Sequence, residues 1–279
     1  MILSTSSINL CGSHVMAIVN VTPDSFYSGS RTLSRGDIIK RVEDVIDGGA
    51  TIIDIGGYSS RPNAEEVSVE QEWERVSMGL EAVRSVDAGV VVSIDSFRAE
   101  VIRRAVEEFG DVIVNDISAG EQDDKMLDVV SRYGLPYVAM HMRGTPKTMQ
   151  SLTSYEDGVV NGVVEYFKRR VEEIVMAGVK RDKIVLDPGF GFAKSVSQNY
   201  ELLRGLAEIR KLGYPMLIGV SRKSMIYKPL GVQPDDALAG SLALAWEVLR
   251  SGDAILRVHD VKESAQLLRL AKTYRDDRG

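Results

Sequence analysis

The sequence is poor in the residues that build sulfur-based or histidine-based sites. Its 279 residues include one cysteine and three histidines. A single cysteine, Cys11, excludes an intramolecular disulfide, and neither a Cys/His cluster nor an HExxH pair of the zinc type is present. The chain also has no glycine-rich P-loop and no convincing GxGxxG sequence. These absences disfavour zinc enzymes and the common nucleotide-binding folds.

Long apolar runs and an excess of basic residues are absent as well. No run approaches the roughly 18 apolar residues of a membrane-spanning helix, and no cationic segment of the signal-peptide type begins the chain. The net charge of −6 gives no electrostatic footprint for nucleic acid. We therefore expect a cytoplasmic protein that binds neither membranes nor nucleic acid. Its local basic clusters, where functional, should bind a small anion.

Eight short, β-branched apolar runs, each followed by a polar cluster, dominate the chain. Runs of this kind predict buried parallel strands joined by crossover helices. The predicted strands are 15–19, 52–53, 90–94, 112–114, 137–140, 184–186, 216–219 and 254–256. The predicted helices are 34–47, 68–86, 99–109, 125–133, 155–176, 198–212, 234–249 and 261–274. The pattern predicts a single (β/α)8 barrel domain over residues 1–279, with residues 1–14 as a hairpin that closes its bottom.

The polar residues that follow the strands fall where barrel enzymes build their active sites. Acceptor groups at four of these ends are Asp54, Asp95, Asn115 and Asp187. A buried carboxylate needs a partner, which here is a divalent metal, a basic neighbour in a structural salt-bridge layer, or the N–H groups of an amino-substituted heterocycle. The turn 187–192 adds aromatic rings that suit a flat ligand.

Basic and hydroxyl side chains follow other strands. They comprise Ser59, Ser60, Arg61, Ser221, Arg222, Lys223, Arg257 and His259. Guanidinium groups and hydroxyls at a barrel mouth suit phosphate oxygens. Asn20, together with phosphate oxygens and water, could hold magnesium. The sequence therefore predicts a planar polar heterocycle at the base of the site and an anion at its rim, beneath two long loops at 22–32 and 56–67.

Several strings resemble the dihydropteroate synthase family when they are taken together. They are Asn20-Val-Thr-Pro-Asp-Ser-Phe26, Asp54-Ile-Gly-Gly57 with Ser60-Arg-Pro62, Ser93-Ile-Asp-Ser96, Asn115-Asp-Ile-Ser118, the run from His141 to Gln150, Asp187-Pro-Gly-Phe-Gly-Phe192, Ser221-Arg-Lys-Ser224 and Arg257-Val-His-Asp260. The resemblance runs from about residue 15 to the end. It implies an enzyme that condenses 7,8-dihydropterin-6-ylmethyl diphosphate with 4-aminobenzoate and releases diphosphate, in folate biosynthesis.

The resemblance also implies a role for each matching residue. The pterin set is Asp95, Asn115, Met140, Asp187 and Lys223. The diphosphate set is Asn20, Ser60, Arg61, Arg257 and His259, with Asn20 as the ligand of a Mg2+ cofactor. The 4-aminobenzoate set is Ser60, Pro62, Phe192, Lys223 and Ser224. The implied catalytic residues are Arg61, Asp95, Lys223, Arg257 and His259, in a homodimer that uses no protein nucleophile.

The chain departs from the usual family pattern at four positions. Tyr58 stands where Glu is usual, Ser60 where Thr is usual, and both Asn63 and Ala193 where Gly is usual. These changes bear on the details of the 56–67 loop and on sulfonamide binding rather than on the reaction. A different class of protein, the methyltetrahydrofolate-binding barrel of cobalamin methyltransferases, resembles the core alone. The synthase-like strings at 20–26 and 59–62 would be superfluous in such a binder.

Overall fold

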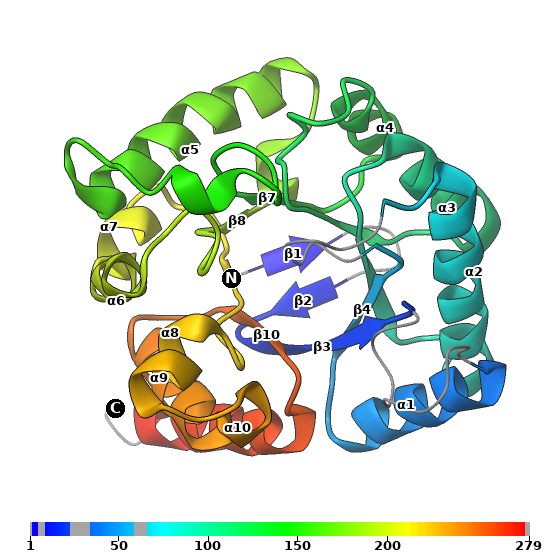
Figure 1. Cartoon of the computed structure of the whole chain (residues 1–279). Helices are drawn as coiled ribbons and strands as arrows, with labels where there is room; N and C mark the ends of the chain where they lie inside the picture. Colours follow the sequence, from blue (N-terminus) through cyan, green and yellow to red (C-terminus); the bar gives the residue numbers. More distant parts are fainter. Residues whose placement is uncertain (1, 5–8, 23–33, 59–65, 277–279) are drawn as a thin grey trace.

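Eight parallel strands form the predicted barrel in this computed structural model, which describes residues 2–4, 9–22, 34–58 and 66–276 (Figure 1). In sheet order the strands are β8 Ile184–Asp187, β7 Tyr137–Met140, β6 Ile113–Asp116, β5 Val91–Asp95, β4 Ile52–Gly56, β3 His14–Asn20, β10 Ile255–Val258 and β9 Leu217–Ile218. A parallel bridge between Leu186 and Met216 links the two ends of this order. The (β/α)8 prediction is confirmed.

Helices surround the barrel, and their apolar faces pack on the outward side chains of the strands (Figure 1). They are α1 Arg35–Asp47, α2 Val69–Val86, α3 Ala99–Phe109, α4 Met126–Tyr133, α5 Gly158–Met176, α6 Val196–Arg204, α7 Leu206–Arg210, α8 Ser224–Leu230, α9 Leu238–Arg250 and α10 Val261–Asp276. Short 3-10 turns are η2 Met149–Ser151, η3 Arg181–Lys183 and η4 Pro234–Asp236. No helix of the described chain is long and apolar enough to cross a membrane.

The predicted single helix over 198–212 is wrong, because the chain breaks at Gly205 into α6 and α7. A Cβ at Gly205 would lie 2.5 Å from a methyl group of Val160, so glycine permits the close approach of α5 here. The helix α8 was not predicted, although it follows the Ser221–Lys223 cluster directly. Pro229 near the end of α8 argues against a helix in the sequence, since proline is unfavourable inside a helix.

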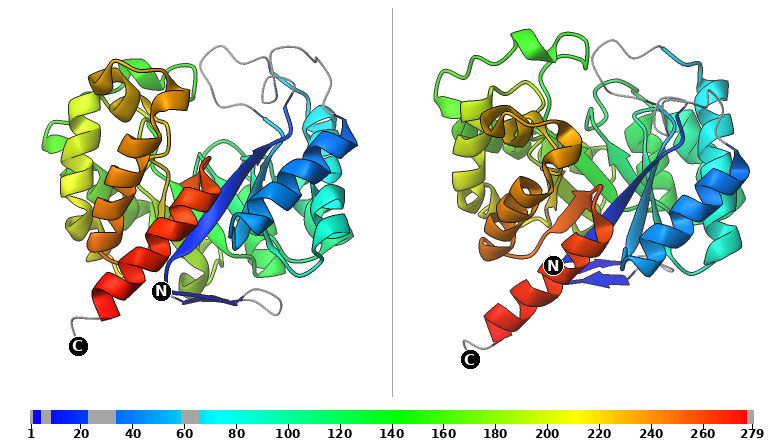
Figure 2. Two further views of the ribbon diagram at one scale, coloured as in Figure 1. Left: turned by 90° about the horizontal axis from the view of Figure 1, so that it is seen from below. Right: turned by 60° about the horizontal axis from the view of Figure 1, so that its bottom comes forward.

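An antiparallel pair of short strands lies at the barrel's lower end (Figure 2). Strands β1 Ile2–Ser4 and β2 Asn9–Cys11 pair antiparallel beneath the barrel, at the end opposite the carboxyl ends of the strands (Figure 2). Leu10 packs there on a layer of inward side chains, one from each strand. The layer comprises Met16, Ile52, Val91, Ile113, Val138, Val185, Leu217 and Ile255. The barrel is therefore dry and filled at this end.

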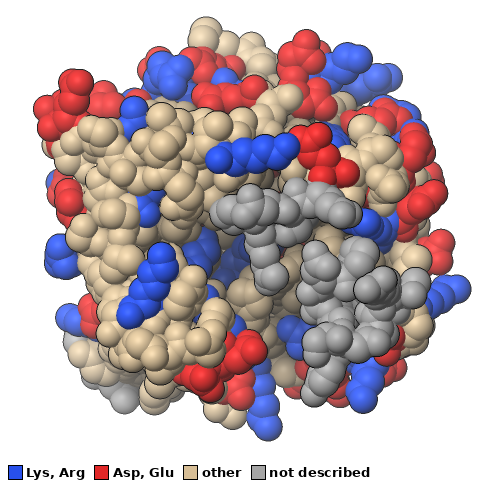
Figure 3. Space-filling model, viewed as in Figure 1, with Lys and Arg blue, Asp and Glu red and all other residues tan. Residues whose placement is uncertain are grey.

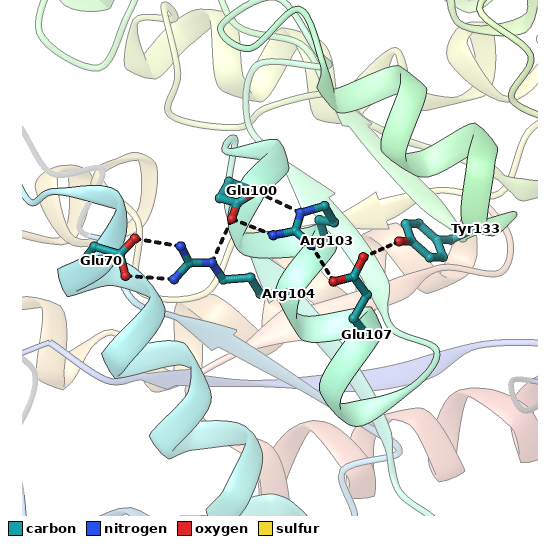
Figure 4. Close-up of polar contacts among 6 residues, drawn as sticks. All are labelled: Glu70, Glu100, Arg103, Arg104, Glu107 and Tyr133. Atoms are coloured by element: carbon teal, nitrogen blue, oxygen red, sulfur yellow. Dashed lines mark hydrogen bonds and ion pairs between the residues drawn. The ribbon is translucent and has the colours of Figure 1, made fainter.

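A chain of ion pairs ties three outer helices together on the surface (Figure 4). Arg104 on α3 pairs with Glu70 on α2 at 2.7 Å and with Glu100 at 2.8 Å. Arg103 pairs with Glu100 at 2.8 Å and with Glu107, which accepts a hydrogen bond from Tyr133 of α4 at 2.7 Å. Exposed pairs of this kind each contribute at most about 1 kcal/mol. The buried layers, rather than this network, hold the barrel together.

We expect Leu10→Ala to lower the free energy of unfolding by about 2–4 kcal/mol, because it leaves a cavity under a fully packed layer. Urea denaturation followed by circular dichroism measures the change. Leu270→Ala is the matched control, since Leu270 is 60% exposed and its truncation removes little buried contact. Equal effects of the two substitutions would contradict the assigned role of the hairpin.

Candidate active site

Two residues above the apolar layer, the barrel interior becomes polar. Inward positions recur at every second residue of a strand, which brings one residue from each strand to this level. The members are Ile18, Asp54, Ser93, Asn115, Met140, Asp187, Gly219 and Arg257. Viewed onto this end, the molecule is hollowed at its centre, and Lys and Arg atoms are visible within the hollow (Figure 3). The polar layer is the floor of that hollow.

Arg257 lies across this floor between two carboxylates. Its Nε donates to Oδ2 of Asp54 at 2.7 Å, and its Nη2 donates to Oδ2 of Asp95 at 2.7 Å. Asn115 Nδ2 donates to the same Asp54 oxygen at 3.2 Å. The side chain of Asp54 is fully buried, whereas those of Asp95 and Arg257 are about one-fifth exposed. The structure thus joins Arg257 of the predicted diphosphate set directly to Asp95 of the predicted pterin set. Through Asp54 it also links Arg257 to Asn115 of the pterin set.

The electrostatics of this cluster follow from its burial. Burial raises the pKa of Asp95 to about 7, against the guanidinium of Arg257, which lowers it, while the Asp54 carboxylate raises it further. Burial acts to lower the pKa of Arg257, but Asp54 and Asp95 together raise it above its ordinary value. The guanidinium is therefore charged at every physiological pH, and Asp95 is the group here whose charge depends on what binds.

Asp187 and Lys223 lie at the opposite side of the floor. Asp187 Oδ1 accepts a hydrogen bond from the backbone N–H of Gly189 at 2.8 Å. Burial raises the pKa of Asp187, and Lys223 opposes this rise. Lys223 donates to the carbonyl of Phe190 and places its Nζ 4.9 Å from the ring centre of Phe192. Burial lowers the pKa of Lys223 to about 8, so this ammonium can lose a proton close to neutrality.

Glycine at 219 leaves open space between two cations. A Cβ there would lie 3.7 Å from Lys223 Nζ and 3.9 Å from Arg257 Cβ. Met140, at the end of β7 in the same layer, is 3% exposed. It packs in a cluster with Ile117, Met142, Met149, Ala193, Phe97 and Phe192. A flat ligand can therefore lie on the floor with an apolar surface along one side.

His259 and Ser221 meet at the rim. His259 Nδ1 lies 3.1 Å from Ser221 Oγ, and the His259 backbone N–H donates to the same hydroxyl at 3.2 Å. Burial lowers the pKa of His259 to about 4, and the charges of Arg257 and Arg222 lower it further. In the free protein the imidazole is neutral. It can become a cation only when an anion close by compensates the two arginines.

Arg222 is not available to a phosphate, contrary to the prediction that grouped it with Ser221 and Lys223. Its Nε and Nη2 donate to the two carboxylate oxygens of Asp260 at 3.1 and 2.6 Å, and Nη1 donates to Asp235 at 2.7 Å. Its φ of 54° is in the left-handed region. This geometry turns the guanidinium outward and ties the loop after β9 to the loop after β10.

Lys194 is a buried cation that sequence reasoning missed. Its Nζ lies 2.9 Å from His141 Nδ1 and donates to the carbonyls of Gly189 and Phe192 at 3.0 and 2.9 Å. Burial lowers the pKa of Lys194 to about 7, although Asp187 opposes this. The lysine closes the turn that carries Asp187 and Phe192. A lysine directly after an aromatic turn was the available signal.

A second missed group holds the ends of the 56–67 loop. Glu72 on α2 is buried, accepts from Ser96 Oγ at 2.6 Å and pairs with Arg98 at 2.8 Å. Arg98 also donates to the carbonyl of Val67 at 2.7 Å and lies 5.5 Å from the ring centre of Tyr58. Burial raises the pKa of Glu72, against the hydrogen bond from Ser96. The signal was a glutamate on the apolar face of a predicted helix.

The remaining predicted residues fall in two groups. Asn20 ends β3, with its Oδ1 beside Gly56: a Cβ there would lie 2.9 Å from this oxygen and 3.8 Å from Asp95 Cβ. Ser224 is the first residue of α8 and is partly buried. Ser60, Arg61 and Pro62 lie outside the described residues, as do Asn63 and most of the 22–32 loop.

Residues 16–259 match the family model for pterin binding enzymes. The chain therefore belongs to the pterin binding enzyme family. Several of its relatives are dihydropteroate synthases. It is 44% identical to the dihydropteroate synthase of Escherichia coli strain K12, over 96% of this chain and 93% of that protein. It is 42% identical to that of a Synechocystis species, over 92% of this chain and 89% of that protein.

Solved structures give the same assignment. The dihydropteroate synthase of Yersinia pestis in complex with a sulfonamide drug superposes with a TM-score of 0.92, at 37% identity, over 99% of this chain and 100% of that one. The Xanthomonas albilineans enzyme with 4-aminobenzoic acid has a TM-score of 0.87, at 34% identity, over 96% and 95% of the two chains. The resemblance stated from the motifs is confirmed.

We expect Gly189→Ala to disrupt the turn that carries Asp187. Gly189 has a φ of 68°, and a Cβ there would lie 2.0 Å from the backbone oxygen of His141. Gly213→Ala is the matched control, since Gly213 has a φ of 80° and nothing within 4 Å. The control isolates the conformational cost of about 1–2 kcal/mol. Thermal and urea denaturation should show a clearly larger loss for Gly189→Ala, and similar losses would argue against the close contact.

Proposed function

We propose that this protein condenses 7,8-dihydropterin-6-ylmethyl diphosphate with 4-aminobenzoate to give 7,8-dihydropteroate and diphosphate. The observation that carries the proposal is the charged floor of the barrel, where Asp54, Asp95, Asn115, Asp187, Lys223 and Arg257 meet in one hollow. Carboxylates facing a guanidinium and an ammonium suit a ligand that is both a hydrogen-bonding heterocycle and an anion.

The pterin ring binds on this floor. A carboxylate accepts two parallel hydrogen bonds from the 2-amino-pyrimidinone edge, and Asp187 is placed for that contact because Gly189 already holds one of its oxygens. Asn115 offers an amide group at the same depth, and Met140 packs against the face of the ring. The apolar layer beneath this floor excludes water from the lower side of the heterocycle.

The diphosphate binds toward the rim. Arg257 supplies a permanent positive charge, and His259 gains a proton as the anion arrives. Arg61 and Ser60 belong to the same set by resemblance. Charge developing on the leaving group is stabilised by such preorganised cations, which is the largest single contribution in many enzymes.

Departure of the diphosphate leaves a cation on the pterin methylene that is delocalised into the ring. The carboxylates of Asp95 and Asp187 favour this positive charge. The amine of 4-aminobenzoate then attacks, held against Phe192 with its carboxylate toward Lys223 and Ser224, and with Ser60 and Pro62 completing the pocket by resemblance. The step requires no protein nucleophile, which agrees with an SN1-like course.

Magnesium fits this arrangement as a cofactor bound with the diphosphate. Asn20 presents an amide oxygen at the end of β3, next to Gly56 and Asp95, and oxygen ligands of this kind suit Mg2+. The described residues contain no cluster of three or more His, Cys, Asp or Glu that could hold a metal alone. Asn20, together with phosphate oxygens of the substrate, would hold the ion, which would supply positive charge to the leaving group.

Two further features are proposed from the family resemblance. We expect a homodimer, and we expect the protein to act in the cytoplasm, where the folate precursors are made. The exposed side chain of Leu230, 57% accessible, is apolar surface available to a second copy.

We expect the purified protein, supplied with Mg2+ and both substrates, to release one diphosphate for each dihydropteroate formed. Coupled detection of diphosphate together with chromatography of the product measures this ratio. Arg257→Ala should lower kcat/KM by about 10²–10³-fold, as expected for loss of one preorganised charge. Tight binding of methyltetrahydrofolate without any diphosphate release would instead favour the methyltetrahydrofolate-binding barrel.

We expect Asn20→Ala to raise the Mg2+ concentration needed for half-maximal turnover by at least about tenfold. The same variant should weaken Mg2+ binding in the presence of the pterin diphosphate, as measured by calorimetry. Asn161→Ala, an exposed amide on α5, is the control. Unchanged Mg2+ dependence in Asn20→Ala would remove Asn20 from the metal site.

A further inference from the structure

Asp54 is a charged residue in the polar layer that no ligand entering from the mouth can reach directly. Its side chain is 0% exposed, whereas Arg257 and Asp95 are 21% and 20% exposed. The register places Asp54 opposite Ser93, two residues below the pairing of Gly56 with Asp95. It therefore lies one level deeper than Asp95. Because its side chain is fully buried, any role in the reaction must pass through a neighbour.

One oxygen of Asp54 organises two of those neighbours. Oδ2 accepts from Arg257 Nε at 2.7 Å and from Asn115 Nδ2 at 3.2 Å. The other oxygen, Oδ1, is buried and has no hydrogen-bond partner among the described residues, as is also true of Ser93 Oγ beside it. A buried carboxylate with one unsatisfied oxygen is costly. The cost is offset where the carboxylate fixes the positions of its partners, here Arg257 and Asn115.

The two ends of the Arg257 guanidinium differ in their surroundings. Nε pairs with the fully buried carboxylate of Asp54, and Nη2 pairs with the carboxylate of Asp95 at the edge of the hollow. A pterin ring that takes its place at Asp95 presents N–H groups to the carboxylate whose Oδ2 now accepts from Nη2. Nη2 must then leave Asp95, whereas nothing competes for the bond between Nε and Asp54.

We propose that Asp54 is a positioning residue that acts through Arg257. It holds Nε in place while the Nη2 end of the guanidinium exchanges the Asp95 carboxylate for the diphosphate of the incoming substrate. This inference rests on the proposed function, since it assumes that pterin and diphosphate share the hollow. The tether limits the side chain to a short swing, which reduces the rotamer entropy that an untethered arginine would lose on binding the anion.

The exchange also changes which anions the guanidinium contacts. In the free protein, Arg257 pairs with Asp95 and with Asp54, and in the complex it pairs with the diphosphate and with Asp54. The Asp95 carboxylate, released from the guanidinium, faces the pterin ring, where positive charge develops as the diphosphate departs. Binding of the pterin ring on the floor thereby frees Nη2 of Arg257 to bind the diphosphate.

The test is the preference for the diphosphate, defined as the Kd of 6-hydroxymethyl-7,8-dihydropterin divided by the Kd of its diphosphate ester. Asp54→Asn keeps the shape of the side chain and removes its charge. We expect this variant to reduce the preference by roughly 10–100-fold, the loss for one hydrogen bond to a charged group. Binding of the unesterified pterin should change by less than about threefold. Asp128→Asn, an exposed carboxylate on α4, is the control and should leave both constants unchanged.

A purely structural role for Asp54 would weaken both ligands alike, so an equal loss for the two pterins overturns the proposal. The double variant gives the sharper result. In an Arg257→Ala background, Asp54→Asn should change the preference by less than about twofold, because the two residues act as one unit. Additive effects of the two substitutions also overturn the proposal. These binding measurements do not depend on turnover. The proposed function is tested separately, and it fails if the wild-type protein makes no dihydropteroate.

Arg257→Lys keeps the test decisive should Asp54→Asn fail to fold, which a thermal melt detects. A lysine ammonium is a single point charge and cannot keep Asp54 while its other end moves from Asp95 to an anion. We expect the same selective loss of preference for the diphosphate. Retention of the wild-type preference in Arg257→Lys overturns the proposal.

Discussion

The burial of Arg257 between Asp54 and Asp95 is the constraint on which the candidate site depends. A guanidinium inside a barrel is tolerated only where carboxylates pair with it, and β4 and β5 supply one each. The layer beneath is entirely apolar, so the charges cannot spread downward. They are confined to the levels immediately under the mouth. The barrel therefore fixes how far below the mouth its charged side chains lie.

At the opposite side of the site, the turn from Asp187 to Lys194 is held by its backbone conformation and by one buried lysine. Gly189, Gly191 and Ala193 have φ values of 68°, 83° and 51°, and Lys194 gathers two carbonyls of this turn around its ammonium. Ala193 adopts the left-handed conformation although it carries a Cβ. The hydrogen bonds of Lys194 join the two ends of the turn that carries Asp187 and Phe192.

Most of the fold could be predicted because its signals are local. Short β-branched runs and helical spacing fall on the observed elements, and Ser34 and Ser68 cap their helices as serine should. The break at Gly205 and the added helix α8 could not be predicted, because both depend on which helix lies alongside. Among the site residues, Arg222 illustrates the same limit. Its charge suggested a phosphate contact, whereas its left-handed backbone and Asp260 turn it outward.

The sequence by itself determined the barrel, the strand ends that carry chemistry and the family to which the chain belongs. These follow from periodicity and from residue types at fixed spacing, which each segment carries alone. Only the tertiary structure decided which charges face one another: Arg257 with Asp54 and Asp95, Lys194 with His141, and Arg98 with Glu72. Partners in these pairs come from segments far apart in the chain. Their meeting depends on register and depth within the barrel, and no local pattern encodes it.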